Sequence, residues 1–129
     1  MTSRSNLAGL AVLVVEDDYY LADDTQRALA AAGARVAGPY ARVAESLSRL
    51  AEGRIDCGVV DVNLGEGPSF ATARALKQRR VPFVFLTGYG REILPDGFDD
   101  IELLEKPVDP QVLIDAVVRA CARASPSRV

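Results

Sequence analysis

The chain has 129 residues, of which 49% are hydrophobic and 26% are charged, and its formal net charge is −3. This length and composition indicate a single folded domain over residues 1–129, with a core over about residues 8–122 and flexible tails at 1–6 and 123–129. The acidic balance argues against a nucleic-acid partner, and the lack of a long apolar run argues against a membrane segment or a secretion signal, so a cytoplasmic protein is expected.

Five short apolar runs predict the strands of the protein. Longer segments with helical periodicity separate them, and three of the runs are almost continuous in apolar residues, as strands covered on both faces tend to be. In chain order, the predicted strands are residues 11–15, 34–38, 57–62, 83–86 and 101–104.

Helical stripes follow the first three runs and the last one. The first helix is expected to begin after Asp18 as N-cap and to end at Gly33, and the second is expected to end at Gly53. The third is expected to have Pro68 at its first helical position, and the last takes Asp109 as its N-cap.

The interval between the fourth and fifth runs is the shortest, and it contains Pro95 and Gly97. A full helix has little room there, so a short helical stub or an irregular loop is expected. The repeated order of strand and helix predicts an α/β fold in which helices cover both faces of a parallel sheet.

Histidine is absent from the chain, which excludes Ser-His and Cys-His hydrolases and zinc sites with histidine ligands. Any chemistry must therefore use carboxylates, hydroxyls, lysine or a bound cation. The two cysteines, Cys57 and Cys121, fit neither a metal-binding spacing nor a disulfide framework, and they are interpreted as small buried side chains.

Acidic side chains stand where two of the predicted strands end. Glu16, Asp17 and Asp18 follow the first strand, and Asp61 and Asn63 lie at the end of the third. Ligands bind at the carboxyl ends of parallel strands, so Glu16, Asp17 and Asp61 meet if these strands are neighbours. Three carboxylates at close quarters repel one another unless a cation compensates, and Mg²⁺ prefers such oxygen ligands.

Two further polar groups complete this set. Thr87 ends the fourth strand, and Lys106 follows the fifth. Taken singly, Lys106 could be a solvated lysine, Thr87 a hydroxyl satisfied by the backbone, and Asp61 a turn residue. Together, a cation, carboxylates, an ammonium and a hydroxyl indicate a phosphoryl-transfer site, in which Asp61 is the best candidate for the nucleophile.

The segments LVVEDD and VVDVN, the threonine at the end of the fourth strand and the KP pair after the fifth resemble the receiver domain of two-component response regulators. The resemblance covers about residues 8–122 and implies a flavodoxin-like (βα)5 fold, a doubly wound parallel sheet of strand order 2-1-3-4-5. It also implies that Asp61 is the phosphoacceptor, which takes a phosphoryl group from a phosphohistidine on a partner kinase or phosphotransfer protein. The absence of histidine fits, because the donor imidazole comes from the partner.

The resemblance assigns roles to the other residues of the set. Asp17 and Asp61 are implied to bind Mg²⁺ directly, helped by the backbone carbonyl of Asn63, while Glu16 acts through water. Lys106 is implied to pair with the phosphoryl oxygens.

Thr87 is implied to reorient so that it hydrogen-bonds the phosphoryl group. Gly88 and Tyr89 lie at positions that modulate the site, Tyr89 at one that tunes dephosphorylation, and Pro107 is expected to follow its lysine through a cis peptide bond. Leu103 stands where most receivers carry a switch tyrosine or phenylalanine.

The stretch PFVFLTGYG over residues 82–90 is similar to the signature of the FAT GUY subgroup of receivers, with Leu86 in place of the subgroup's alanine. Members are typically single-domain, are often paired with HWE or HisKA2 kinases, and tend to have a reduced or mobile fourth helix. We therefore hypothesise that the loop over residues 88–97 changes state on phosphorylation and controls a downstream protein target.

The leading interpretation is a stand-alone receiver in two-component phosphorelay signalling, because the chain ends soon after Pro107. Such a protein is not an enzyme beyond its own phosphorylation and dephosphorylation, and a monomer or weak dimer is expected. One alternative is a receiver-like scaffold that is never phosphorylated. Another is a small Mg²⁺-dependent phosphatase or Toprim-like enzyme, although such enzymes generally need an aspartate where this chain has Asn63.

Overall fold

The computed structural model describes residues 6–64, 67–68, 70–88 and 94–124. Its parallel strands are β1 (Ala11–Val15), β2 (Arg35–Tyr40), β3 (Cys57–Asp61), β6 (Phe83–Thr87) and β7 (Leu103–Glu105). They form one sheet in the order β2-β1-β3-β6-β7. This is the predicted order 2-1-3-4-5 of a doubly wound sheet.

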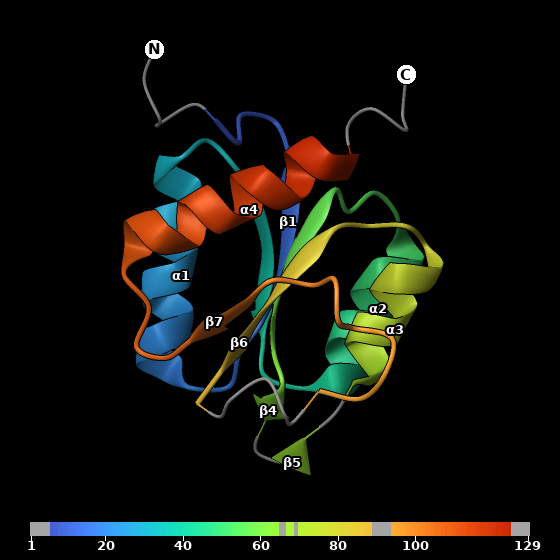
Figure 1. Ribbon diagram of the computed structural model, residues 1–129. Helices are drawn as coiled ribbons and strands as arrows, with labels where there is room; N and C mark the ends of the chain where they lie inside the picture. Colours follow the sequence, from blue (N-terminus) through green and yellow to red (C-terminus); the bar gives the residue numbers. More distant parts are fainter. Residues whose placement is uncertain (1–5, 65–66, 69, 89–93, 125–129) are drawn as a thin grey trace.

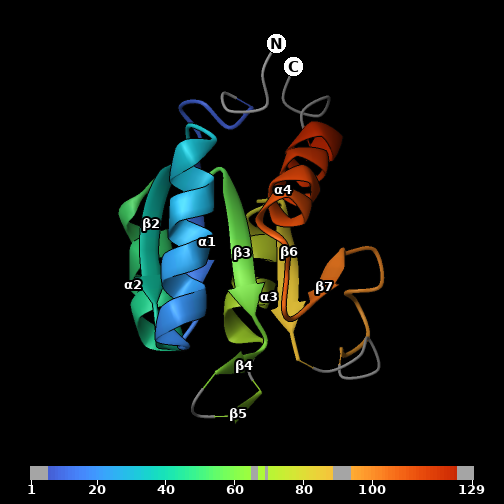
Figure 2. The same ribbon diagram turned by 90° about the vertical axis from the view of Figure 1, so that its left-hand side faces the viewer.

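Helices cover both faces of this sheet. One face carries α1 (Tyr19–Ala31) and α4 (Pro110–Ala124), and the other carries α2 (Val43–Glu52) and α3 (Ala71–Gln78), as Figures 1 and 2 show. A small antiparallel hairpin, β4 (Asn63–Leu64) and β5 (Gly67–Pro68), lies beyond the carboxyl end of β3. None of the described helices is both long and apolar enough to cross a membrane.

Side chains alternate between the two faces along the central strands. In β1, Val12 and Val14 join the core under α1 and α4, whereas Leu13 and Val15 join the core under α2 and α3. All residues of β1, β3 and β6 are buried. Burial on both faces explains why these strands read as continuous apolar runs in the sequence.

The predicted helix ends are confirmed at several points. The carboxylate of Asp18 accepts a hydrogen bond from the N–H three residues later at 3.0 Å, and that of Asp109 accepts one from the N–H two residues later at 2.7 Å. Each satisfies a backbone donor that the first turn of its helix leaves unpaired. Gly33 follows α1 with a φ of 98°, a conformation that favours glycine, and Gly53 ends α2.

Three predicted boundaries are wrong. Pro68 does not open the third helix, because its backbone pairs with Asn63 in the β4–β5 hairpin, and α3 begins only at Ala71. The second strand runs past the predicted end to Tyr40, with a shift in its register against β1. The last strand begins at residue 103 instead of 101, because Ile101 donates its N–H to a turn.

The connection between β6 and β7 contains no helix in its described residues, 88 and 94–102. Phe98 takes the place of helix packing: it is 2% exposed, and its ring centre lies 5.3 Å from that of Phe85 and 6.0 Å from that of Phe70. With Phe83 these residues form the phenylalanine cluster, which contains every phenylalanine of the chain. The expected irregular loop is therefore confirmed for these residues, and it is anchored in the core.

The two cysteines lie side by side on β3 and α4. Cys57 is buried and Cys121 is half-buried, both are free thiols, and Cys121 packs against the core that contains Cys57. A hydrogen bond with the Cys121 thiol, together with burial, raises the pKa of Cys57 well above its ordinary value. The prediction of small packing side chains is confirmed for Cys57.

Candidate functional site

Two buried carboxylates meet at the carboxyl edge of the sheet. β1 and β3 are parallel neighbours with Val15 opposite Val60, so the residues that follow, Glu16 and Asp61, come together. Glu16 is 2% exposed and Asp61 is 1% exposed. Carboxylates buried this close to each other are costly unless a positive charge lies beside them.

Lys106 supplies a positive charge. Its backbone N–H donates to the carbonyl oxygen of Thr87 at 2.8 Å, which fixes it at the end of β6. Its ammonium nitrogen lies 2.8 Å from Asp61 Oδ2, and 3.1 Å and 3.3 Å from the two carboxylate oxygens of Glu16. The peptide bond between Lys106 and Pro107 is cis, as expected.

Asp17 adds a third carboxylate from the exposed side. One oxygen each from Glu16, Asp17 and Asp61 lies within 4.8 Å of the others. We call these residues and Lys106 the acidic edge, since it carries three carboxylates and one ammonium. Its oxygen donors and net negative charge fit a hard divalent cation such as Mg²⁺.

The pKa of Glu16 is strongly shifted by its surroundings. Burial, with the hydrogen bond and negative charge of Asp61, raises the pKa of Glu16 from its ordinary 4.5 to about 7, although the N–H of Asp18 and the charge of Lys106 oppose the rise. Glu16 Oε1 is buried and receives no hydrogen bond from any residue that the structure describes. The acidic edge therefore favours an added positive charge, either a proton or a cation.

The ammonium of Lys106 responds in the opposite direction to its surroundings. Partial burial lowers its pKa, but the hydrogen bond and charge of Asp61 and the charge of Glu16 outweigh burial, so the pKa of Lys106 is raised. The lysine is therefore protonated throughout the physiological range, as a group that neutralises anionic oxygens must be.

Three further predicted residues, Thr87, Gly88 and Asn63, lie at or just beyond the carboxyl ends of β6 and β3. Thr87 is the last residue of β6 and is fully buried, one position beyond the residue that pairs with Asp61. Gly88 follows it and is exposed. Asn63 begins β4, two residues after Asp61.

Two predicted modulating residues lie away from the acidic edge or outside the described chain. Leu103 begins β7 opposite Phe85 and is half-buried against the core under α2 and α3. Tyr89 lies outside the described residues, as do residues 90–93 of the proposed switch loop.

A family model for the response regulator receiver domain matches residues 12–118. The chain belongs to the response regulator receiver family. No curated protein matches the chain, but many solved structures resemble it.

Solved structures agree with this identification. SdrG from Sphingomonas melonis Fr1 is 34% identical with a TM-score of 0.74, and the match covers 94% of this chain and 98% of that one. A response regulator receiver protein from Sinorhizobium medicae WSM419 is 27% identical with a TM-score of 0.80, over 89% of this chain and 96% of that one. The response regulator PhyR from Brucella abortus is 20% identical over 98% of this chain and 54% of its own, with a TM-score of 0.83, and shows the fold alone.

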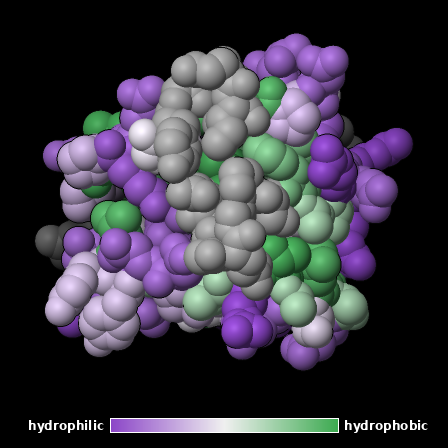
Figure 3. All heavy atoms as spheres, turned by 90° about the horizontal axis from the view of Figure 1, so that it is seen from below, coloured by the Kyte–Doolittle hydropathy of each residue, from purple (hydrophilic) through white to green (hydrophobic). Residues whose placement is uncertain are grey.

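The sequence interpretation of this receiver missed an exposed aromatic pair beside the acidic edge. Tyr19 and Tyr20 open α1 directly after the acidic residues, are 76% and 77% exposed, and meet edge to face at 5.3 Å. Their position off the apolar stripe of the helix is the signal that could have revealed them. On this end of the molecule, apolar residues gather instead on the side of α2 and α3 (Figure 3).

Proposed function

We propose that this receiver is a phosphorylatable switch, in which Asp61 accepts a phosphoryl group from the phosphohistidine of a histidine kinase or phosphotransfer protein. The observation that carries the proposal is the ammonium of Lys106, 2.8 Å from the carboxylate of Asp61, with the Glu16 and Asp17 carboxylates beside it. An ammonium and a cation beside the acceptor neutralise the negative charge that an incoming phosphoryl group carries.

The transfer exchanges one bond to phosphorus for another. A carboxylate oxygen of Asp61 forms a bond to phosphorus while the bond between phosphorus and the donor imidazole nitrogen breaks, and the imidazole leaves with that electron pair. Lys106 is proposed to hold one phosphoryl oxygen, and the Thr87 hydroxyl at the end of β6 is proposed to hold another.

Bound Mg²⁺ would supply positive charge to the phosphoryl oxygens during this step. The carboxylates of Asp17 and Asp61 and the backbone carbonyl of Asn63 are proposed to hold it, with Glu16 acting through water. The buried carboxylate of Glu16 supports this assignment, because three carboxylates share the single positive charge of Lys106 and Glu16 Oε1 receives no hydrogen bond from the described residues.

The output is proposed to be a contact with a protein target, made by a stand-alone receiver in the cytoplasm as a monomer or weak dimer. The FAT GUY-like stretch over residues 82–90 supports an HWE or HisKA2 kinase as donor and the loop over residues 88–97 as the switch. Leu103 stands in place of an aromatic switch residue, which further supports the loop as the switch.

Phosphorylation with acetyl phosphate and Mg²⁺, followed by intact-protein mass spectrometry, tests the proposal. The wild type is expected to gain one phosphoryl group and Asp61→Asn none. Asp115→Asn is the matched control, because Asp115 is an exposed aspartate on α4, outside the acidic edge and the proposed switch loop. Its labelling should equal that of the wild type.

A panel of histidine kinases extends the test to the donor. The wild type should be labelled by at least one kinase in the panel and Asp61→Asn by none. A folded wild type that neither acetyl phosphate nor any kinase labels would identify a scaffold. Steady turnover of a phosphate ester without labelling would identify an enzyme.

A further inference from the structure

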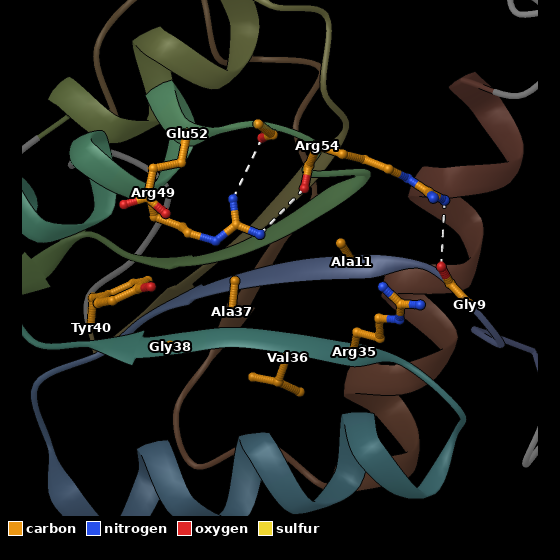
Figure 4. Close-up of a pocket in the computed structure, with 11 residues that line it drawn as sticks. Gly9, Ala11, Arg35, Val36, Ala37, Gly38, Tyr40, Arg49, Glu52 and Arg54 are labelled. Atoms are coloured by element: carbon orange, nitrogen blue, oxygen red, sulfur yellow. Dashed lines mark hydrogen bonds between the residues drawn. The ribbon is translucent and has the colours of Figure 1, made fainter.

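A groove on the α2 side of the sheet has no role in the proposed phosphoryl transfer. It lies between the C-terminal half of α2 and the edge strand β2, and its volume is about 500 Å³. Small-molecule sites usually fall within about 300–1,000 Å³. Figure 4 shows that α2 and the turn after it form one wall, and that β1 and β2 form the floor.

Small side chains on the floor create the groove. Arg35 and Ala37 project to the same side of β2, and Ala11 of the neighbouring strand lies opposite Arg35. Figure 4 shows Arg35 at one end of the groove and the ring of Tyr40 at the other, with the two alanines between them. A larger residue at either alanine would fill this space.

Three arginines line the groove against one acid, although the whole chain carries a net charge of −3. Arg54 is partly neutralised, because its Nε lies 3.0 Å from a carboxylate oxygen of Asp56. Arg49 reaches two carbonyl oxygens only at 3.5 Å, which is the limit for a hydrogen bond. The Arg35 side chain makes no hydrogen bond or ion pair with any residue in the described part of the chain, and Glu52 is the single acid in the lining.

We propose that this groove binds a mononucleotide-like ligand, with its phosphate on Arg35 and Arg49 and its flat ring against Tyr40. Guanidinium groups bind phosphate oxygens through paired hydrogen bonds, and both of these arginines have donors to spare. The face of a tyrosine ring offers a stacking surface for a base, and the carboxylate of Glu52 can accept hydrogen bonds from hydroxyl or amino groups. A simple inorganic anion would leave the tyrosine end unused.

The groove and the acidic edge are separate sites that share one backbone contact. The carbonyl oxygen of Tyr40 accepts a hydrogen bond from the N–H of Glu16 at 2.9 Å. No acidic side chain of the acidic edge lines the groove. The two proposals therefore rest on different side chains, and each can fail without the other.

Titration of the ¹⁵N-labelled full chain by NMR tests this inference. The probes are the four common ribonucleoside 5′-monophosphates, inorganic phosphate and adenosine. At least one nucleotide should produce saturable shifts at the amides of Arg35, Ala37 and Tyr40. Phosphate alone should bind roughly tenfold or more weakly, since it lacks the ring.

Variants locate the binding. Arg35→Gln and Arg49→Gln should each weaken nucleotide binding roughly tenfold, because each removes paired hydrogen bonds to phosphate. Arg35→Gln should melt like the wild type, since the Arg35 side chain is exposed and holds no described partner. The matched control is Arg74→Gln, which removes an exposed guanidinium on α3 outside the groove and should leave binding unchanged.

Three results would overturn the proposal. One is the absence of saturable shifts with every nucleotide up to about 10 mM. Another is an equal loss of affinity in Arg74→Gln, which would show general attraction of anions to the surface. Equal affinity for inorganic phosphate and all nucleotides would show that the Tyr40 ring does not contact the ligand.

Discussion

The acidic edge lies at the carboxyl ends of β1 and β3, whereas the phenylalanine cluster joins β6 to its connection with β7. The two regions should affect the stability of the fold in opposite directions. The acidic edge gathers carboxylates with a single ammonium, and burial lifts the pKa of Glu16 to about 7. The phenylalanine cluster gathers four apolar rings with centres 5.3 to 6.4 Å apart and carries no polar group. One region holds charges that repel, and the other buries apolar surface.

This difference shows how the molecule separates chemistry from stability. Natural sites commonly retain groups that destabilise the fold because the chemistry requires them. Here the destabilising carboxylates stand at the ends of strands β1 and β3, whose side chains are packed on both faces. Changes in the two regions should therefore shift the free energy of unfolding in opposite directions.

The largest expected effect comes from the phenylalanine cluster. Phe98→Ala should lower the free energy of unfolding by about 3–5 kcal/mol, because it removes a buried ring and the only cluster member on the β6–β7 connection. Urea denaturation monitored by circular dichroism measures the change. Phe98→Leu is the control and should lose less, since it keeps part of the apolar volume.

The alternative for this connection is that polar contacts alone hold it. In that case the free energy of unfolding of Phe98→Ala would lie within about 1 kcal/mol of the wild-type value. Such a result would show that the phenylalanine cluster does not stabilise the fold in the way that the comparison with the acidic edge requires.

The next effect is the pH dependence of the acidic edge. Folding raises the pKa of Glu16 from 4.5 to about 7, so the folded protein holds this proton more tightly than the unfolded chain. The stability that Glu16 contributes is complete below pH 4.5 and is lost as pH rises through about 7. The loss should be on the order of 3 kcal/mol in metal-free protein.

Denaturation curves of wild type and Glu16→Gln from acid to neutral pH isolate this contribution. The free-energy difference between the two proteins should shift in favour of Glu16→Gln as pH rises, because glutamine does not ionise. Mg²⁺ should reduce the shift by compensating the carboxylate. A difference that stays flat over this range would contradict the raised pKa.

Neutralising the acceptor should stabilise the protein. Asp61→Asn should raise the free energy of unfolding at neutral pH by about 1–2 kcal/mol, because it removes one of the repelling carboxylates. It should also bring the pKa of Glu16 down toward its ordinary value, since Asp61 contributes to the rise. Asp115→Asn, on the exposed face of α4, should change stability little. Destabilisation by Asp61→Asn would mean that the ion pair with Lys106 outweighs the repulsion between the carboxylates.

Most of the fold could be predicted because its central strands are buried on both faces. That burial makes 11–15, 57–62 and 83–86 read as apolar runs, and the parallel order follows from the alternation with helices. Phe98 could not be predicted, because it stands alone between Gly97 and acidic residues, and its burial depends on contacts distant in sequence. The hairpin that contains Pro68 could not be predicted either, since proline is common at the first position of a helix.

The acidic edge could be predicted because strand ends in a parallel sheet converge on one edge. Sequence alone could not show that Glu16 is buried while its neighbour Asp17 is exposed, because this depends on where the chain turns after β1. No sequence motif indicates the groove. It arises from small residues on adjacent strands and from arginines that lie far apart in the sequence.

The smallest expected effect comes from the polar contacts beside the phenylalanine cluster. Lys77 on α3 donates to the carbonyl of Gly97, lies 3.6 Å from a carboxylate oxygen of Asp100, and stands 5.7 Å from the centre of the Phe98 ring. Both charged side chains are largely exposed, so Lys77→Gln should cost less than about 1 kcal/mol of global stability.

Hydrogen exchange can resolve what this loss of contact does locally. The amide of Ile101, which donates to the carbonyl of Phe98, should exchange faster in Lys77→Gln, while the amides of β1 and β3 keep their wild-type rates. Lys77→Arg is the control, since it retains the charge and the donors. A global loss as large as that of Phe98→Ala would instead show that the charged contacts, and not the buried ring, hold the β6–β7 connection against the sheet.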